Sequence, residues 1–142
     1  MLIKQLSIFV ENKHGRMAEI AEIISAAGVD IRALSVADTT DFGILRLIVD
    51  APDKAVEVLK TAGITVSLTD VIAVGIDDKP GAFSKAVRTL SNENIDIEYM
   101  YAFISRTEGK ASVILRIDDV QKGMDVLQNG GFELLTGAEI YK

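Results

Sequence analysis

The sequence predicts an α+β protein made of two βαββαβ units that follow one another in the chain. Apolar residues recur at every second position in some segments and at every third or fourth position in others, in the order strand, helix, strand, strand, helix, strand. The whole order then occurs a second time, with glycines at matching places. A chain of 142 residues is long enough for two small units of this kind.

Each element of the first half is marked by a periodic pattern and a stop signal. Leu6, Ile8 and Val10 alternate along the first strand, and Ile20 and Ile24 share one face of the helix that follows. The predicted elements are, in chain order, a strand over residues 2–10, a helix between Gly15 and Gly28, a strand over residues 30–36, a hairpin loop over residues 38–43, a strand over residues 44–49, a helix that Pro52 opens and Gly63 ends, and a short strand over residues 64–68.

The second half repeats the first in register, which indicates an internal duplication. Gly81 corresponds to Gly15, an offset of 81 − 15 = 66 residues. Gly131 corresponds to Gly63, an offset of 131 − 63 = 68, so two extra residues fall in the second hairpin loop, over residues 105–110. We therefore expect two domains, residues 1–69 and residues 70–142, that pack together without a flexible linker.

A βαββαβ unit is the ferredoxin-like plan, with strand order 4-1-3-2 and both helices on one face of the sheet. The second strand of the second half is apolar on both faces, which is hazardous on an open edge, so we expect it to pair with the second strand of the first half. The two units would then lie side by side as one eight-stranded antiparallel sheet with four helices on one face. The other face carries Phe9, Ile44, Ile48 and Ile114, which predicts a homodimer that buries it.

The composition argues against several classes of function. Asp and Glu total 21 against 15 Lys and Arg, and a net charge of −6 is unsuited to nucleic acid. An RNA-recognition module has the same order of elements, but it needs stacking aromatic residues on its central strands, and residues 43–49 and 111–117 contain none. No apolar run approaches the roughly 20 residues that span a bilayer, and no signal peptide is visible. We therefore expect a cytoplasmic protein with neither a nucleic-acid nor a membrane partner.

Two strand-to-helix turns form the candidate site, over residues 12–17 (NKHGRM) and residues 78–83 (DKPGAF). Free backbone N–H groups at a helix N-terminus bind a carboxylate, and an aspartate at the start of the next strand, Asp30 or Asp96, would accept hydrogen bonds from an ammonium group. An α-amino acid carries both groups. The alternative is structural, because Asn12, Asp78 and Pro80 are ordinary residues for capping and starting a helix, and Asp30 and Asp96 are ordinary turn residues.

Few residues offer catalytic or metal-binding chemistry. His14 is the only histidine and the chain has no cysteine, so neither a thiolate site nor a histidine pair is available for a metal. Arg16 would add a cation for a carboxylate, although an arginine at the start of a helix more commonly faces solvent. The familiar motifs GxSxG, HExxH and the P-loop are absent from the sequence. We expect no catalytic residues, no cofactor and no metal.

At these residues the sequence resembles tandem ACT domains. Asp78-Lys79-Pro80-Gly81 with Asn94-Ile95-Asp96-Ile97 is close to the pattern "DKPG…GINVDMI" of aspartokinase regulatory regions. Asn12-Lys13-His14-Gly15 with Gly28-Val29-Asp30-Ile31 is similar to the pattern "NRPG…GVNI" of the serine-sensing domain of phosphoglycerate dehydrogenase. The resemblance covers essentially the whole chain, with two departures: His14 replaces the usual proline, and Val10 stands where the serine sensor has a histidine.

The resemblance implies a non-catalytic regulatory protein that binds a small effector, an amino acid, at the interface between its two ACT units. Residues 78–83 would then face residues 30–36, and residues 12–17 would face residues 96–101. It also implies that any regulated enzyme of amino-acid metabolism is a separate chain. The alternatives are an interaction module with a degenerate ligand site, and a small enzyme that depends on His14 or a carboxylate. The expected ligand-binding residues are Asn12, His14, Gly15, Arg16, Met17, Asp30, Ile31, Asp78, Pro80, Gly81, Ala82, Phe83, Asp96 and Ile97.

Overall fold

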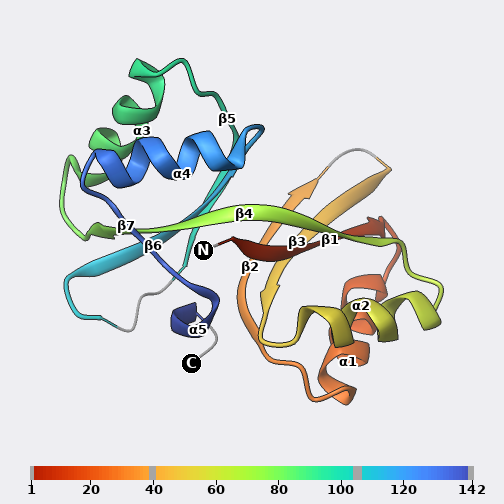
Figure 1. Cartoon of the computed structure of the whole chain (residues 1–142). Coiled ribbons are helices and arrows are strands. Elements are labelled where there is room, and N and C mark those ends of the chain that lie inside the picture. The colour runs from red at the N-terminus through yellow and green to blue at the C-terminus, as the bar shows by residue number, and fades with distance from the viewer. Residues whose placement is uncertain (1, 39–40, 104–106, 141–142) are drawn as a thin grey trace. The chain divides into compact units, whose positions relative to one another are not determined.

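A strand, a helix and a hairpin begin each half of the protein, for which a computed structural model describes residues 2–38, 41–103 and 107–140 (Figure 1). The chain divides into two units, Lys4–Thr69 and Asp70–Ile140, and Leu2 and Ile3 belong to the second. Both predicted hairpin loops, over residues 38–43 and 105–110, include residues outside the described part of the chain.

The first unit has the strand order β2-β3-β1-β4, which is the predicted order 4-1-3-2 of the ferredoxin-like plan. Its elements are β1 (Ile3–Glu11), α1 (Arg16–Ala26), β2 (Ile31–Asp38), β3 (Phe42–Val49), α2 (Pro52–Thr61) and the first part of β4 (Val66–Asp77). β1 and β2 both pair antiparallel with β3, so they run parallel to each other and β2 is an outer strand.

The second unit repeats this order as β7-β4-β6-β5. Its elements are the rest of β4, α3 (Ala82–Asn92), β5 (Ile97–Phe103), β6 (Lys110–Ile117), α4 (Val120–Asn129) and β7 (Glu133–Leu134), followed by a short helix α5 (Gly137–Ile140) that the sequence analysis did not predict. β4 and β5 both pair antiparallel with β6, so β5 is the outer strand here.

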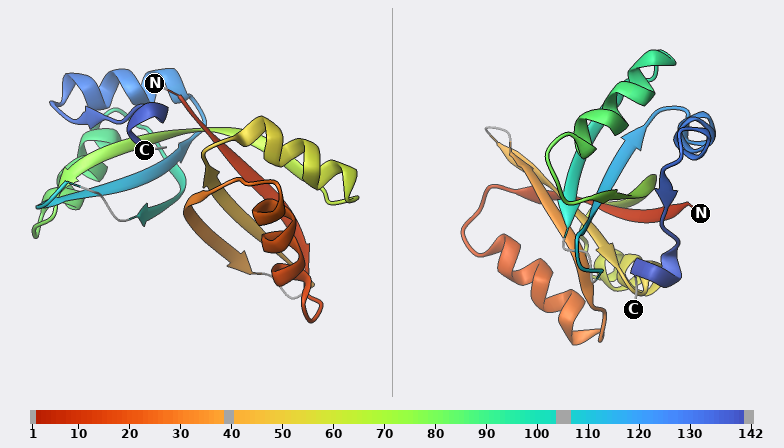
Figure 2. Two further views of the ribbon diagram at one scale, coloured as in Figure 1. Left: turned by 90° about the horizontal axis from the view of Figure 1, so that it is seen from below. Right: turned by 90° about the vertical axis from the view of Figure 1, so that its left-hand side faces the viewer.

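One strand, β4, replaces two of the predicted strands. Separate strands were predicted on either side of Thr69 and Asp70, but β4 runs without a break from Val66 to Asp77 (Figures 1 and 2). The sheet therefore has seven strands and not eight. The predicted pairing of the two second strands is also wrong, because β2 and β5 stand at the two ends of the strand order. Backbone pairing does not depend on side-chain polarity, so two polar residues do not interrupt a strand.

Each unit has its own apolar core, in which both helices lie on one face of the strands. In the first unit, Ile24 of α1 and Leu59 of α2 pack over the inward-facing residues of β1 and β3. In the second unit, Leu90 of α3 and Leu127 of α4 are the corresponding residues. All four side chains are at most 1% exposed. This burial is what holds helices of only 10 or 11 residues in place.

Residues with positive φ follow the four longer helices and allow the chain to turn back to the sheet. Gly28, Gly63 and Gly131 have φ values of 74°, 78° and 85°. Asn94 takes this role after α3 with φ 57°, and asparagine is one of the few residue types besides glycine that adopt this conformation. The helix ends predicted at Gly28 and Gly63 are therefore confirmed.

The apolar face that was predicted to bury itself in a homodimer is partly buried already. Ile48 and Ile114 are both 0% exposed within the single chain, so they are not available to a partner. Phe9 remains 49% exposed and its ring lies 5.7 Å from that of Phe42. The sequence pattern identified an apolar face, but it did not show which of its residues the chain itself covers.

Replacing Leu59 by alanine should lower the free energy of unfolding by about 2–5 kcal/mol, because the change removes a fully buried side chain and leaves a cavity. The measurement is urea-induced unfolding followed by circular dichroism. The control is Lys60→Ala, at an exposed position of the same helix, which should change the free energy by less than about 0.5 kcal/mol. Equal losses in the two variants would contradict the core described above.

Candidate functional site

The two strand-to-helix turns have the same backbone hydrogen bonds. In the first, Lys13 N–H donates to the oxygen of Glu11 at 2.7 Å and Arg16 N–H donates to the oxygen of Lys13 at 3.2 Å. In the second, Lys79 donates to Asp77 at 3.0 Å and Ala82 donates to Lys79 at 3.3 Å. The predicted offset of 66 residues therefore relates two copies of one turn, bond by bond.

Glycine is required in both turns by the backbone conformation and not by lack of space. Gly15 and Gly81 precede the first helical residue with φ values of 80° and 89°, where an L side chain is strained. A Cβ atom at either position would meet nothing within 4 Å. The glycine therefore sets the direction in which the helix leaves the turn.

Neither α1 nor α3 begins with a side-chain cap. The N-cap residue of each is a glycine and, within the described residues, makes no side-chain cap hydrogen bond, whereas Asp119 caps α4 by accepting from Lys122 N–H at 3.1 Å. The side chain of Asn12 is engaged elsewhere, because its amide donates to Asp38 Oδ1 at 3.4 Å. The cap position of each helix is therefore the glycine and not Asn12 or Asp78.

The charged side chains around the first turn are paired with one another. Lys13 Nζ lies 2.7 Å from Glu11 Oε2, and Arg16 Nη1 lies 3.0 Å from Glu19 Oε2. The hydrogen bond from Lys13 lowers the pKa of Glu11 from its ordinary value. These residues, together with the exposed His14 and Gly15, line a shallow hollow of about 250 Å³.

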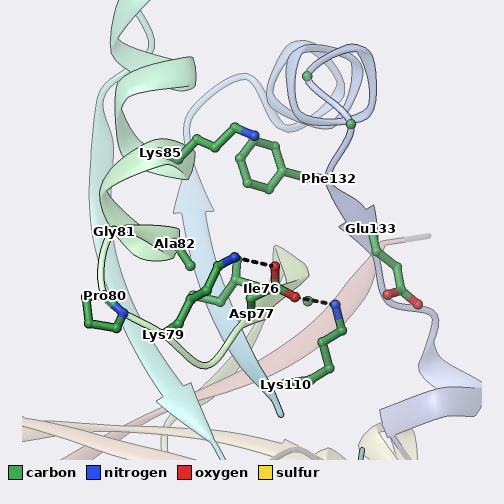
Figure 3. A pocket seen from close by; sticks show the side chains of 13 residues that line it. Ile76, Asp77, Lys79, Pro80, Gly81, Ala82, Lys85, Lys110, Phe132 and Glu133 are labelled. Carbon is green, nitrogen blue, oxygen red and sulfur yellow. Dashed lines mark hydrogen bonds and ion pairs between the residues drawn. The ribbon is translucent and has the colours of Figure 1, made fainter.

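The second turn opens onto a larger hollow of about 550 Å³ (Figure 3). Asp77, at the end of β4, lies between two lysines: Lys110, which donates a hydrogen bond to it, and Lys79, whose Nζ is 3.8 Å away. The bond from Lys110 is the main reason that the pKa of Asp77 is lowered, and it raises the pKa of Lys110 in turn. Lys85, in the first turn of α3, extends toward the loop after α4, and its ammonium lies 6.0 Å from the centre of the Phe132 ring.

The predicted aspartates at the start of the second strands do not lie beside the turn of their own unit. Glu11 is opposite Phe42 and Ile31 is opposite Val49, so the turn and the start of β2 are at opposite ends of β3. Asp30 is engaged there, since Arg32 donates to its carboxylate at 2.9 Å. The corresponding separation holds in the second unit, where Asp77 is opposite Lys110 and Ile97 is opposite Ile117. That each turn faces the second strand of the other half stays a prediction.

Four predicted residues lie in apolar grooves between the first helix and the outer strand of each unit. Met17 and Ile31 line a groove of about 270 Å³ in the first unit. Phe83 and Ile97 line the corresponding groove in the second unit, which is nearly filled and leaves only about 10 Å³. The predicted site residues therefore divide into turn residues, groove residues and the two distant aspartates.

Several residues that line these surfaces were not predicted from the sequence. Lys85 follows Gly81 by one turn of helix, so its place on the turn side of α3 was open to prediction from the helical period. Lys110 is opposite Asp77 in the sheet, which only the hairpin register reveals. Phe132 and Glu133 come from the loop after α4, and no local signal in the sequence connects that loop with the turn.

The described residues carry no sign of a metal centre or a membrane span. They contain no group of three or more His, Cys, Asp or Glu side chains that could hold a metal ion. None of the helices in this part of the chain is long and apolar enough to cross a bilayer.

Comparisons with known proteins agree with this architecture. The family model described as "ACT domain pair" matches residues 1–141. The crystal structure of protein BT0572 from Bacteroides thetaiotaomicron is 41% identical, with a TM-score of 0.94 over 100% of this chain and 97% of that one. No curated protein matches the chain.

The regulatory subunit of aspartate kinase from Thermus thermophilus, in a ligand-free form, has a TM-score of 0.64 at 15% identity, over 91% of this chain and 93% of that one. The corresponding subunit from Thermus flavus has a TM-score of 0.62 at 14% identity, over 90% and 92%. At these identities the two subunits show a shared fold alone. The family model and the closely similar crystal structure extend over nearly the whole sequence, and the chain therefore belongs to the family of ACT domain pairs.

Proposed function

We propose that this ACT domain pair is a non-catalytic regulatory protein of the cytoplasm that binds a small effector, an amino acid. The effector binds at the strand-to-helix turns, as the resemblance to regulatory ACT domains implies. Binding favours one conformation or assembly of the protein over another, because the effector contacts one of them better. Any enzyme that responds to this change is a separate chain.

One observation carries the proposal: the same uncapped turn occurs twice, each time with a glycine at positive φ before the helix. A carboxylate is the natural ligand of such a helix start, since the unpaired N–H groups and the helix dipole both favour a negative charge. The hollow beside the second turn has room for a small molecule.

The alternative, an interaction module with a degenerate site, is favoured by the first turn alone. There Lys13 is paired with Glu11 and Arg16 with Glu19, which leaves no spare positive charge for a ligand. The second turn differs in this respect, so we assign effector binding to the second unit first.

Titration of the common amino acids into the protein, followed by calorimetry, should show at least one that binds at millimolar or lower concentration. Ala82→Glu should weaken this binding about tenfold or more, because it places a competing carboxylate at the start of α3. The helix itself should tolerate the change, since an acidic residue in its first turn is favourable.

The control for that experiment is Ser91→Glu, which adds the same charge near the other end of α3, about 13 Å away along the helix. It should leave the affinity within about twofold of the wild-type value. If no amino acid binds to the wild-type protein at millimolar concentration, the sensor proposal loses its support and the interaction module becomes the better reading.

We further propose that the protein is a homodimer joined along the outer edge of β2. Leu34 and Val36 of this strand are 61% and 49% exposed, and with Met17 they form the open side of the apolar groove in the first unit. An outer strand with exposed apolar residues favours pairing with another strand. The outer strand of the second unit is less available, because the groove beside it leaves only about 10 Å³.

The sequence of β2 complements an antiparallel copy of itself. A two-fold axis at Ser35 would place Leu34 opposite Val36 of the second copy, and the small residues Ala33 and Ala37 opposite each other. The same register brings Arg32 opposite Asp38, so unlike charges meet at both ends of the pairing. A second copy of this chain therefore fits the edge in both shape and charge.

Val36→Arg should shift the protein from dimer to monomer in sedimentation velocity experiments at micromolar concentration, because it would bury a charge at the centre of the paired edges. The control is Ala102→Arg, at the corresponding exposed position of β5, 102 − 36 = 66 residues later. It should leave the dimer intact. Dissociation by both variants to the same extent, or a wild-type protein that is monomeric throughout, would rule out the β2 edge.

A further inference from the structure

The hollow beside the second turn is formed by three separate stretches of the second unit (Figure 3). The turn and the first helical turn of α3 form one wall, the start of β6 forms the floor, and the loop between α4 and β7 forms the opposite wall. Within this loop, Gly130 and Gly131 line the hollow, so at these two positions the backbone faces it. The volume of about 550 Å³ is in the range of small-molecule sites.

The charged groups around the hollow are three lysines and two carboxylates, so its lining carries one net positive charge. Lys79 and Lys110 both form an ion pair with Asp77, and the charge of Glu133 further raises the pKa of Lys110. Lys85 contacts the face of Phe132, and within the described part of the chain no carboxylate forms an ion pair with it. Both carboxylates therefore act on the side of Lys79 and Lys110, whereas Lys85 faces an aromatic ring and keeps its charge for a ligand.

The first unit lacks this excess of positive charge although its turn has the same backbone. At the offset of 66 residues, Lys85 corresponds to Glu19, which is bound to Arg16. Lys110 lies opposite Asp77, the last residue of β4. The corresponding residue of the first unit, opposite Glu11 at the end of β1, is Phe42. The positive hollow is thus a property of the second unit and is not required by the fold.

We propose that this hollow selects an effector with two carboxylates, such as an acidic amino acid. One carboxylate would bind the uncapped start of α3 together with Lys85. The other would bind Lys79 and Lys110, for which Asp77 is the one carboxylate within ion-pair distance among the described residues. The carboxylate of Glu133, on the far wall, is available to the ammonium group of an amino acid. This inference rests on the proposed function, to which it adds the charge of the effector.

The test is calorimetric titration of aspartate and glutamate against their neutral amides, asparagine and glutamine, with succinate as a dicarboxylate that lacks the amino group. At least one acidic amino acid should bind tenfold or more tightly than its amide. Lys85→Glu, which gives the second unit the charge found in the first, should weaken that binding at least tenfold. Lys54→Glu, an equal charge change at an exposed position of α2, should weaken it less than twofold.

Each outcome separates this inference from the proposal on which it rests. Binding of a neutral amino acid with no preference for its acidic relative would overturn the two-carboxylate inference and leave the sensor proposal standing. Equal losses in Lys85→Glu and Lys54→Glu would also overturn it, because the effect would then come from net charge alone. Succinate that binds as tightly as aspartate would support the two-carboxylate site and show that the amino group is not recognised. Absence of binding by all five compounds overturns the inference, and absence of binding by the remaining amino acids as well overturns the sensor proposal.

Discussion

A single backbone constraint shapes each half of this protein: the chain must leave the strand and start a helix that lies back over the sheet. It does so through a glycine with positive φ, Gly15 in one unit and Gly81 in the other. The direction set there brings Ile24 or Leu90 over the strands and so determines the core. The same geometry leaves the helix start without a side-chain cap, and the groups that remain free are those that bind an anion.

Much of this fold could be predicted because the duplication doubles every local signal. One glycine before a helix is a weak marker, but two at a constant offset identify a repeated turn, and the order of elements and the helix ends follow from the same comparison. The strand β4 was divided wrongly because Thr69 and Asp70 are polar, whereas the backbone continues to form hydrogen bonds through them. Polar residues are thus a poor guide to where a strand ends when the strands that pair with it come from distant parts of the chain.

The site was harder to predict than the fold. The turn residues, from His14 to Arg16 and from Pro80 to Ala82, do line hollows, because their position depends on a local motif. Asp30 and Asp96 were placed correctly in the sequence but lie at the other end of their own strands, a consequence of strand direction that no residue pattern encodes. Lys110, Phe132 and Glu133 reach the second hollow only through sheet register and loop packing.

The two units have kept one backbone and diverged in their surfaces. In the first, acids and bases around the turn neutralise each other, while the groove beside β2 stays open and apolar. In the second, the groove is filled and the turn carries excess positive charge. Such a division allows one repeat to change its ligand chemistry without altering the contacts of the other.

The lysine-lined hollow also lies on a strongly acidic molecule, since the whole chain has a net charge of −6. An approaching anion therefore meets a field that is repulsive on average at long range, and it meets attraction only within roughly one Debye length, about 8 Å at physiological ionic strength. Moderate salt screens the distant repulsion more than the close attraction. For this protein, a moderate rise in ionic strength should therefore have two opposite effects. It raises the rate at which an anion reaches the hollow, and it weakens the binding of the anion once it is there.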